Sequence, residues 1–141
     1  MTTEAGEVRR ELEAIASDPD FELKSQALAD GWDAREVGVE AVEPVLRFME
    51  SHPDIEYGSP GALVHFVERF HHRGYEQLLL DSLSRLPTGI TTWMLNRLIN
   101  GTRDATLRRQ YLQAMERASI HPKANVEIRR QACRFLTNAC P

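Results

Sequence analysis

The chain has 141 residues, of which 42% are hydrophobic and 27% are charged, and its formal net charge is −4. This composition is ordinary for a soluble globular protein, and no apolar run approaches the ~18 residues that a membrane-spanning helix requires. The charged N-terminus also lacks the apolar stretch of a secretory signal, so the sequence predicts one intracellular domain over residues 1–141, without membrane attachment.

The charge is distributed unevenly along the chain. Residues 1–60 contain 15 acidic and five basic side chains, a net charge of −10, whereas residues 61–141 contain six acidic and 12 basic side chains, a net charge of +6. Such a division influences the choice of partners and the rate of association rather than the fold.

Four helices are predicted in the first half of the chain. The second is expected to end near Gly31, and the third to begin at about Val42, because Pro44 is tolerated only in a first turn. The fourth is expected to run from about Pro60 to His72. The apolar positions at helical spacing are Val8, Leu12 and Ile15; Phe21, Leu28 and Trp32; Val42, Val45, Leu46 and Met49; and Leu63, Val64, Phe66, Val67 and Phe70.

Four more helices are predicted in the second half, separated by Pro87, Gly101 and Pro122. Their apolar positions are Tyr75, Leu78, Leu79, Leu83 and Leu86; Met94, Leu95, Leu98 and Ile99; Leu107, Tyr111, Ala114, Met115 and Ala118; and Ile128, Ala132, Phe135, Leu136 and Ala139.

These patterns predict an all-α fold of about eight short amphipathic helices. No segment shows the sustained alternation of a strand. The prolines at 44, 87 and 122 are 43 and 35 residues apart, near the ~40–47-residue period of HEAT-type helix pairs. We therefore expect antiparallel hairpins stacked in a HEAT-like manner, with a closed helical bundle as the alternative.

Three polar residues of the fourth predicted helix have the spacing of a metal site. His65, Glu68 and His72 lie at i, i+3 and i+7, on the side opposite the apolar stripe. Against a metal, Arg69 lies on the same face, and no second helix supplies a recognisable ligand motif. The interpretation favoured is a solvated polar face, so no metal and no cofactor are predicted.

The two cysteines give no sign of catalysis. Cys133 and Cys140 are two helical turns apart, about 10 Å along an axis, which is too far for a disulfide within one helix. Neither begins a helix beside a candidate base, so buried, inert and reduced thiols are expected. No catalytic residue is predicted, and the protein is not expected to be an enzyme.

The C-terminal third is basic, which raises the possibility of nucleic-acid binding. The chain as a whole is acidic, however, and the basic residues fall mostly on the side away from the apolar stripes, as on any solvated face. The pattern therefore argues against a nucleic-acid partner. The basic residues are Arg103, Arg108, Arg109, Arg117, Lys123, Arg129, Arg130 and Arg134.

Two sets of residues are candidates for binding a protein partner. In the sixth predicted helix, tryptophan, arginine and asparagine share one face, and these residue types anchor interfaces, although the tryptophan could instead pack against a neighbouring layer of helices. The second set is acidic, and ordinary solvation is its alternative explanation. The first set is Trp93, Asn96, Arg97 and Asn100. The second is Asp30, Asp33, Glu36, Glu40 and Glu43.

Three segments together resemble the small helical immunity proteins of bacterial contact-dependent and polymorphic toxin systems. They are DIEYGSPGALVHFVERF, GYEQLLLDSLSRLPT and WMLNRLIN, within residues 54–100, about a third of the chain. The main cues are the loop-to-helix start GSPGALVHF and the turn-to-helix PTGITTWMLNR. The resemblance implies an all-α, HEAT-like fold. It transfers no contact residue, because immunity proteins differ in where they bind their toxins.

The resemblance also implies a function, which is to bind and block a cognate toxin domain in the cytoplasm. Many such toxins are nucleases with basic active sites, to which an acidic inhibitor is complementary. We expect a monomer or weak dimer that binds one toxin domain. The alternatives are a HEAT-like adaptor that binds a peptide or helix, a nucleic-acid-binding helical protein, and a metal protein or enzyme that uses His65, Glu68 and His72.

Overall fold

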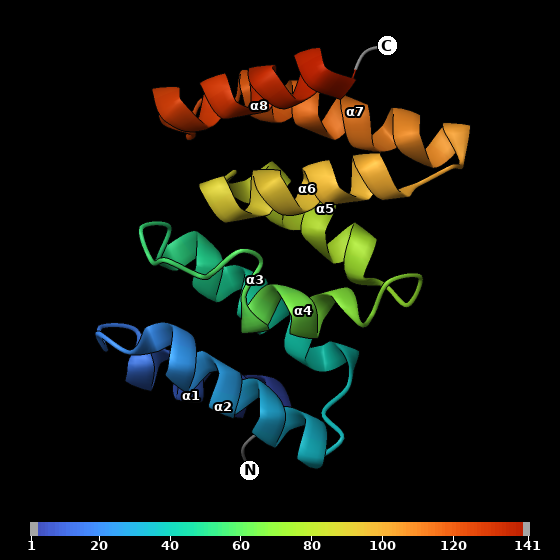
Figure 1. Cartoon of the computed structure of the whole chain (residues 1–141). Coiled ribbons are helices and arrows are strands. Elements are labelled where there is room, and N and C mark those ends of the chain that lie inside the picture. Colours follow the sequence, from blue (N-terminus) through green and yellow to red (C-terminus); the bar gives the residue numbers. More distant parts are fainter. Residues whose placement is uncertain (1–2, 140–141) are drawn as a thin grey trace. The chain divides into compact units, whose positions relative to one another are not determined.

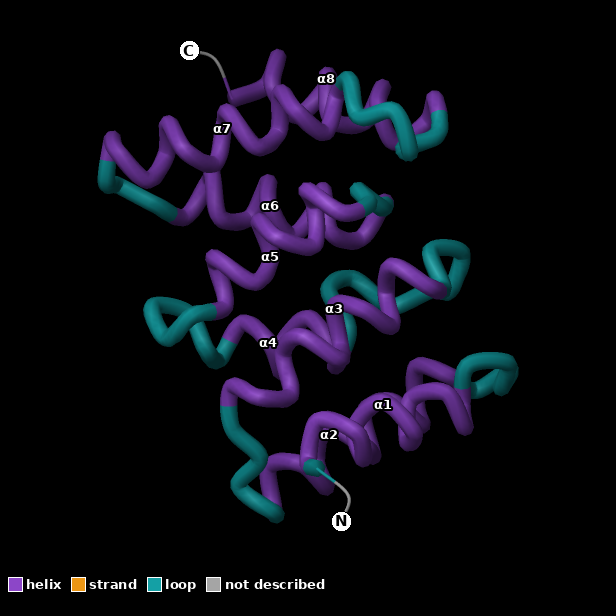
Figure 2. Tube along the Cα trace, turned by 180° about the vertical axis from the view of Figure 1, so that it is seen from behind, coloured by secondary structure: helices purple, strands orange, loops and turns teal. Residues whose placement is uncertain are grey.

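The computed structural model describes residues 3–139, and every regular element in this range is helical (Figure 2). The all-α prediction is therefore confirmed for the described residues. None of the helices in this range is both long and apolar enough to span a membrane. The elements are α1 (Glu4–Ile15), α2 (Phe21–Ala34), the 3₁₀ helix η1 (Val39–Ala41), α3 (Val42–Ser51), α4 (Ala62–Glu68), α5 (Tyr75–Arg85), α6 (Gly89–Gly101), α7 (Ala105–Ser119) and α8 (Val126–Ala139).

The chain divides into two compact units, with the boundary inside α5. The acidic unit, residues 1–78, contains 17 acidic and seven basic side chains, a net charge of −10. The basic unit, residues 79–141, contains four acidic and ten basic side chains, a net charge of +6. The charge division of the sequence thus coincides with the division into units. A single domain with HEAT-like stacking stays a prediction.

In the acidic unit, α1 packs against α2 and α3, and α2 packs against α4 (Figure 1). The predicted apolar stripes supply this core: Trp32 is fully buried, and its ring meets the ring of Phe66 edge-on with centroids 5.0 Å apart. The rings of Phe21 and Phe48 stack at 5.9 Å. Aromatic packing of this kind contributes beyond the area that it buries.

The second helix ends later than the sequence predicts. It continues through Gly31 to Ala34, and the chain then turns at Glu36, which has a left-handed φ of 56°. The amide of Val37 donates to the carbonyl of Trp32 at 2.9 Å, and the amide of Glu36 donates to Asp33, which together make a Schellman cap. A glutamate therefore occupies the position that usually favours glycine.

The third helix begins at Val42 with buried Pro44 in its first turn, as predicted. The fourth is shorter than predicted, because turns replace helix after Glu68 and continue to Gly74. Gly61, just before this helix, has a φ of 90°, and a Cβ there would lie 1.7 Å from the carbonyl oxygen of Tyr57. Only glycine fits at this position.

In the basic unit, α6, α7 and α8 pack against one another. Helix α6 begins with a buried capping box, in which the hydroxyl of Thr88 accepts from the amide of Thr91 at 3.2 Å and that of Thr91 accepts from the amide of Thr88 at 3.0 Å. The Gln131 amide of α8 donates to the carbonyl of Gly89 and to the hydroxyl of Thr92. These bonds join the end of one helix to the side of another and satisfy polar groups that packing has removed from water.

Candidate functional site

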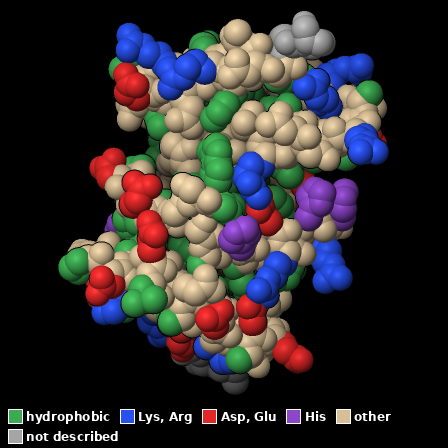
Figure 3. Space-filling view, viewed as in Figure 1, with side chains coloured by type: hydrophobic (Ala, Val, Ile, Leu, Met, Phe, Trp, Pro, Cys, Tyr) green, Lys and Arg blue, Asp and Glu red, His purple; other side chains and the backbone are tan. Residues whose placement is uncertain are grey.

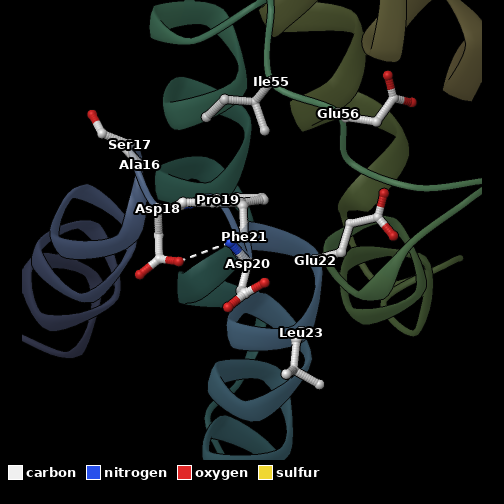
Figure 4. A pocket seen from close by; sticks show the side chains of 10 residues that line it. All are labelled: Ala16, Ser17, Asp18, Pro19, Asp20, Phe21, Glu22, Leu23, Ile55 and Glu56. Carbon is white, nitrogen blue, oxygen red and sulfur yellow. Dashed lines mark hydrogen bonds between the residues drawn. The ribbon is translucent and has the colours of Figure 1, made fainter.

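The loop between α1 and α2 borders a hollow of about 480 Å³ in the acidic unit (Figure 4). We call it the acidic hollow, and residues 16–23, 55 and 56 line it. Pro19 prevents the helix from continuing, so the chain reverses here and the next helix begins at Phe21. The hollow therefore forms where a loop between two helices meets a second loop more than 30 residues further along the chain.

Four carboxylates and several apolar side chains together line the acidic hollow (Figure 4). The carboxylates belong to Asp18, Asp20, Glu22 and Glu56. Leu23 stands at the edge with 73% of its surface exposed. The hollow therefore combines an exposed apolar side chain with carboxylates.

Asp18 is paired with a cation of the same loop-and-helix segment, Lys24. The Oδ1 atom of Asp18 also accepts from the amide of Asp20 at 2.8 Å. The hydrogen bond from Lys24, followed by that from the Asp20 amide, lowers the pKa of Asp18 below its usual value. The side chains of Asp20, Glu22 and Glu56 are exposed to solvent. Lys24 also attracts Asp20: the hydrogen bond to Asp18 is the largest cause that raises the pKa of Lys24, and the charge of Asp20 contributes to the same rise.

The acidic set predicted from the sequence does not form this hollow. Asp33 pairs with Arg69. Glu40 and Glu43 line a different hollow of about 550 Å³ between α1 and α3, beside Arg9 and Arg47. The remaining two are exposed: Asp30 accepts a hydrogen bond from Gln26, and Glu36 caps α2.

Sequence reasoning missed the acidic hollow because it treated residues 17–20 only as a helix break. The sequence does contain a sign of the hollow, because acidic residues occur at every second position next to Pro19, at Asp18, Asp20 and Glu22. Ile55 and Glu56, in contrast, join them only through the tertiary fold.

The predicted face of α6 is present in the basic unit. The apolar stripe of Met94, Leu95, Leu98 and Ile99 is buried, whereas Trp93, Asn96 and Arg97 are partly exposed and Asn100 is exposed. The Arg97 guanidinium lies over the Trp93 ring, 5.2 Å from its centroid, a cation–π arrangement that holds both side chains in place. A role for this face in partner binding stays a prediction.

The histidine set considered from the sequence does not come together. His65 is exposed on α4, and that helix ends at Glu68, so His72 does not continue its face. Among the described residues, the group that gathers possible metal ligands is instead His71, His72 and Glu76. The expectation that His65 and His72 lie at the surface is confirmed.

The expectation of buried cysteines is wrong for Cys133, which is exposed. It follows buried Ala132 on α8 and therefore points about 100° away from the packed side of the helix. It lines a hollow of about 650 Å³ with Ile120, which is 77% exposed, and with Val126 and three arginines. Cys140 lies outside the described residues.

Comparisons with known proteins do not assign the chain to a family. No protein-family model, curated protein or solved structure matches it. The functional argument therefore depends on the surfaces described above.

Proposed function

We propose that this protein is a cytoplasmic immunity protein that binds a cognate bacterial toxin domain and blocks it without turnover. The supporting observation is the acidic hollow with its exposed leucine, in a unit of net charge −10. The toxin would belong to a contact-dependent or other polymorphic system, and a nuclease is the chemistry that this charge fits best.

The acidic hollow supplies the two kinds of contact that stabilise a protein interface. Leu23 offers apolar area that a partner removes from water, and such contacts concentrate binding energy at a few positions. Glu22 and Glu56 are positioned to pair with lysine or arginine side chains of the partner. A basic, partly apolar surface is therefore the expected complement.

The charge of the whole unit adds to these contacts at longer range. In Figure 3, many Asp and Glu side chains are visible over the α1–α4 part of the chain. A net charge of −10 attracts a basic partner before contact and raises the association rate. Fast capture benefits an inhibitor that must act before a nuclease cleaves its substrate.

The test is co-expression with the toxin domain encoded beside this protein, together with calorimetry of the purified pair. We expect wild-type protein to restore growth and to bind one toxin domain. Leu23→Ala and Glu56→Gln should each weaken binding by about tenfold or more, a loss typical of interface hot spots. Ile120→Ala is the matched control, because the exposure of Ile120, 77%, is close to the 73% of Leu23, but Ile120 lies in the basic unit.

The possible results distinguish an error in the proposed function from an error in the proposed location of the binding site. Loss of binding with Ile120→Ala alone would move the contact surface to the basic unit. Equal binding by all three variants would exclude both hollows as the main contact. If the neighbouring gene product is harmless and does not bind, the immunity function itself is wrong.

A further inference from the structure

The turn between α4 and α5 brings two imidazoles and one carboxylate together. Possible ligand atoms of His71, His72 and Glu76 all lie within 4.8 Å of one another. The Nε2 atom of His71 is 3.4 Å from Oε2 of Glu76, and the Nδ1 atom of His72 is 3.8 Å from the same oxygen. The two imidazole ring centroids are 3.9 Å apart.

The backbone of this turn holds the carboxylate in place. His72 has a φ of 66°, and its amide donates to both carboxylate oxygens of Glu76, at 2.7 Å to Oε2 and 3.1 Å to Oε1. The turn itself is closed by the amides of Arg73 and Tyr75, which both donate to the carbonyl of Phe70. Only 16% of the Glu76 side chain is exposed, so its position is restricted before any ligand arrives.

We propose that His71, His72 and Glu76 form a binding site for a divalent transition metal of the zinc type. The ligands would be Nε2 of His71, Nδ1 of His72 and Oε2 of Glu76, with water completing the coordination. Two imidazoles and a carboxylate are a common ligand set for zinc. This site is independent of the toxin-binding function proposed above.

The distances from the two imidazoles to the Glu76 carboxylate suit a zinc ion. Bonds of about 2.0–2.1 Å in a tetrahedral arrangement separate neighbouring ligand atoms by about 3.3 Å. The His71–Glu76 separation of 3.4 Å already has this value, and the His72–Glu76 separation of 3.8 Å requires a shift of a few tenths of an ångström. Oε1 of Glu76 would still accept from the His72 amide, the type of outer contact that orients metal ligands.

The surrounding charge favours a cation despite two arginines nearby in the sequence. Arg69 is paired with Asp33, and Arg73 is exposed, so that solvent screens its charge. The site also belongs to the unit of net charge −10, which raises the local concentration of cations. The side chains of His71 and His72 are 47% and 73% exposed, which leaves an open path for the ion.

The test is calorimetric titration of zinc into the full chain, purified without a histidine tag. We expect one zinc per chain, and His71→Gln, His72→Asn and Glu76→Gln should each weaken its affinity by at least about tenfold. Asparagine tolerates the positive φ of position 72, and glutamine retains an acceptor for the His72 amide, so both variants should fold. Circular dichroism checks that they do.

His65→Gln is the matched control, because it removes an exposed histidine of the same unit that lies outside the cluster. It should leave zinc affinity unchanged. Cobalt provides a second readout: its visible absorption should report a bound, low-coordinate ion in wild type and in His65→Gln, and should be lost in His71→Gln. Absence of binding at about 100 μM zinc, or equal weakening by His65→Gln, would overturn the proposal.

Discussion

At the scale of single residues, Tyr57 shows how burial controls an ionisable group. Its side chain is buried, and its hydroxyl donates to the carbonyl of His52 at 2.7 Å. Burial, with a smaller contribution from the negative charge of Glu13, raises the pKa of Tyr57 well above the ordinary tyrosine value of 10.0. The folded state therefore retains a neutral phenol under conditions in which the unfolded state ionises.

This shift predicts a loss of stability in alkali. Because the pKa of Tyr57 is higher in the folded state, its contribution is complete below pH 10.0 and declines as the pH rises above that value. Tyr57→Phe should remove this part of the alkaline decline, while costing about 1 kcal/mol at neutral pH through the lost hydrogen bond. Urea denaturation from pH 7 to pH 11 measures both effects. An unchanged alkaline decline in the variant would contradict the assignment.

At the scale of helices, the informative feature is how α2 ends. Glu36 adopts the left-handed conformation that closes the Schellman cap, although its Cβ makes this conformation costly. The capping hydrogen bonds and burial of the following Val37 compensate for that cost. The end of α2 is thus stabilised by capping hydrogen bonds and by packing, and not by a residue type that favours the left-handed conformation.

Replacing Glu36 with glycine should stabilise the protein. Removing Cβ relieves about 1–2 kcal/mol of strain, and the greater freedom of glycine in the unfolded chain offsets part of it. We expect the free energy of unfolding to rise by about 0.5–1 kcal/mol. Ala27→Gly, on the exposed side of α2, is the control and should lower it by about 1 kcal/mol. A loss of stability in Glu36→Gly would show that its side chain contributes more than its strain costs.

At the scale of the whole molecule, the two compact units have net charges of opposite sign, −10 and +6. Each unit also contains one of the two tryptophans, Trp32 in the acidic unit and Trp93 in the basic unit. Ion pairs such as Arg35 with Glu4 offset some of the repulsion in the acidic unit, but exposed pairs of this kind contribute little. Repulsion among like charges should therefore dominate the effect of salt on the stability of the acidic unit.

Salt should stabilise the acidic unit. Raising NaCl from about 0.05 to about 0.5 M screens repulsion among like charges, so the urea midpoint reported by Trp32 fluorescence should rise. The midpoint reported by Trp93 should rise less, because the basic unit has a smaller net charge. Trp93→Phe and Trp32→Phe isolate the two signals. A fall in the Trp32 midpoint would mean that the ion pairs outweigh the net repulsion.

The helices of this protein were predictable because local signals specify them. Within residues 3–139, which the structure describes, apolar residues at helical spacing marked all eight α-helices. Pro44 located the start of the third, since its ring is tolerated only in the first turn. The helix ends were less predictable. Glu36 and His72 take left-handed conformations that are uncommon for residues other than glycine, so the local sequence did not predict them.

The sequence by itself determined the all-α class, the positions of the buried stripes and the division of charge, because each depends on residue type and on spacing within one helix. Only the tertiary structure decided which polar groups meet. It brought Glu56 to the hollow that Asp18 also lines, and it brought His71 and His72 to Glu76 instead of extending His65 and His72 along one helix. Side chains converge through turns and packing between segments, and these depend on contacts that no single segment encodes.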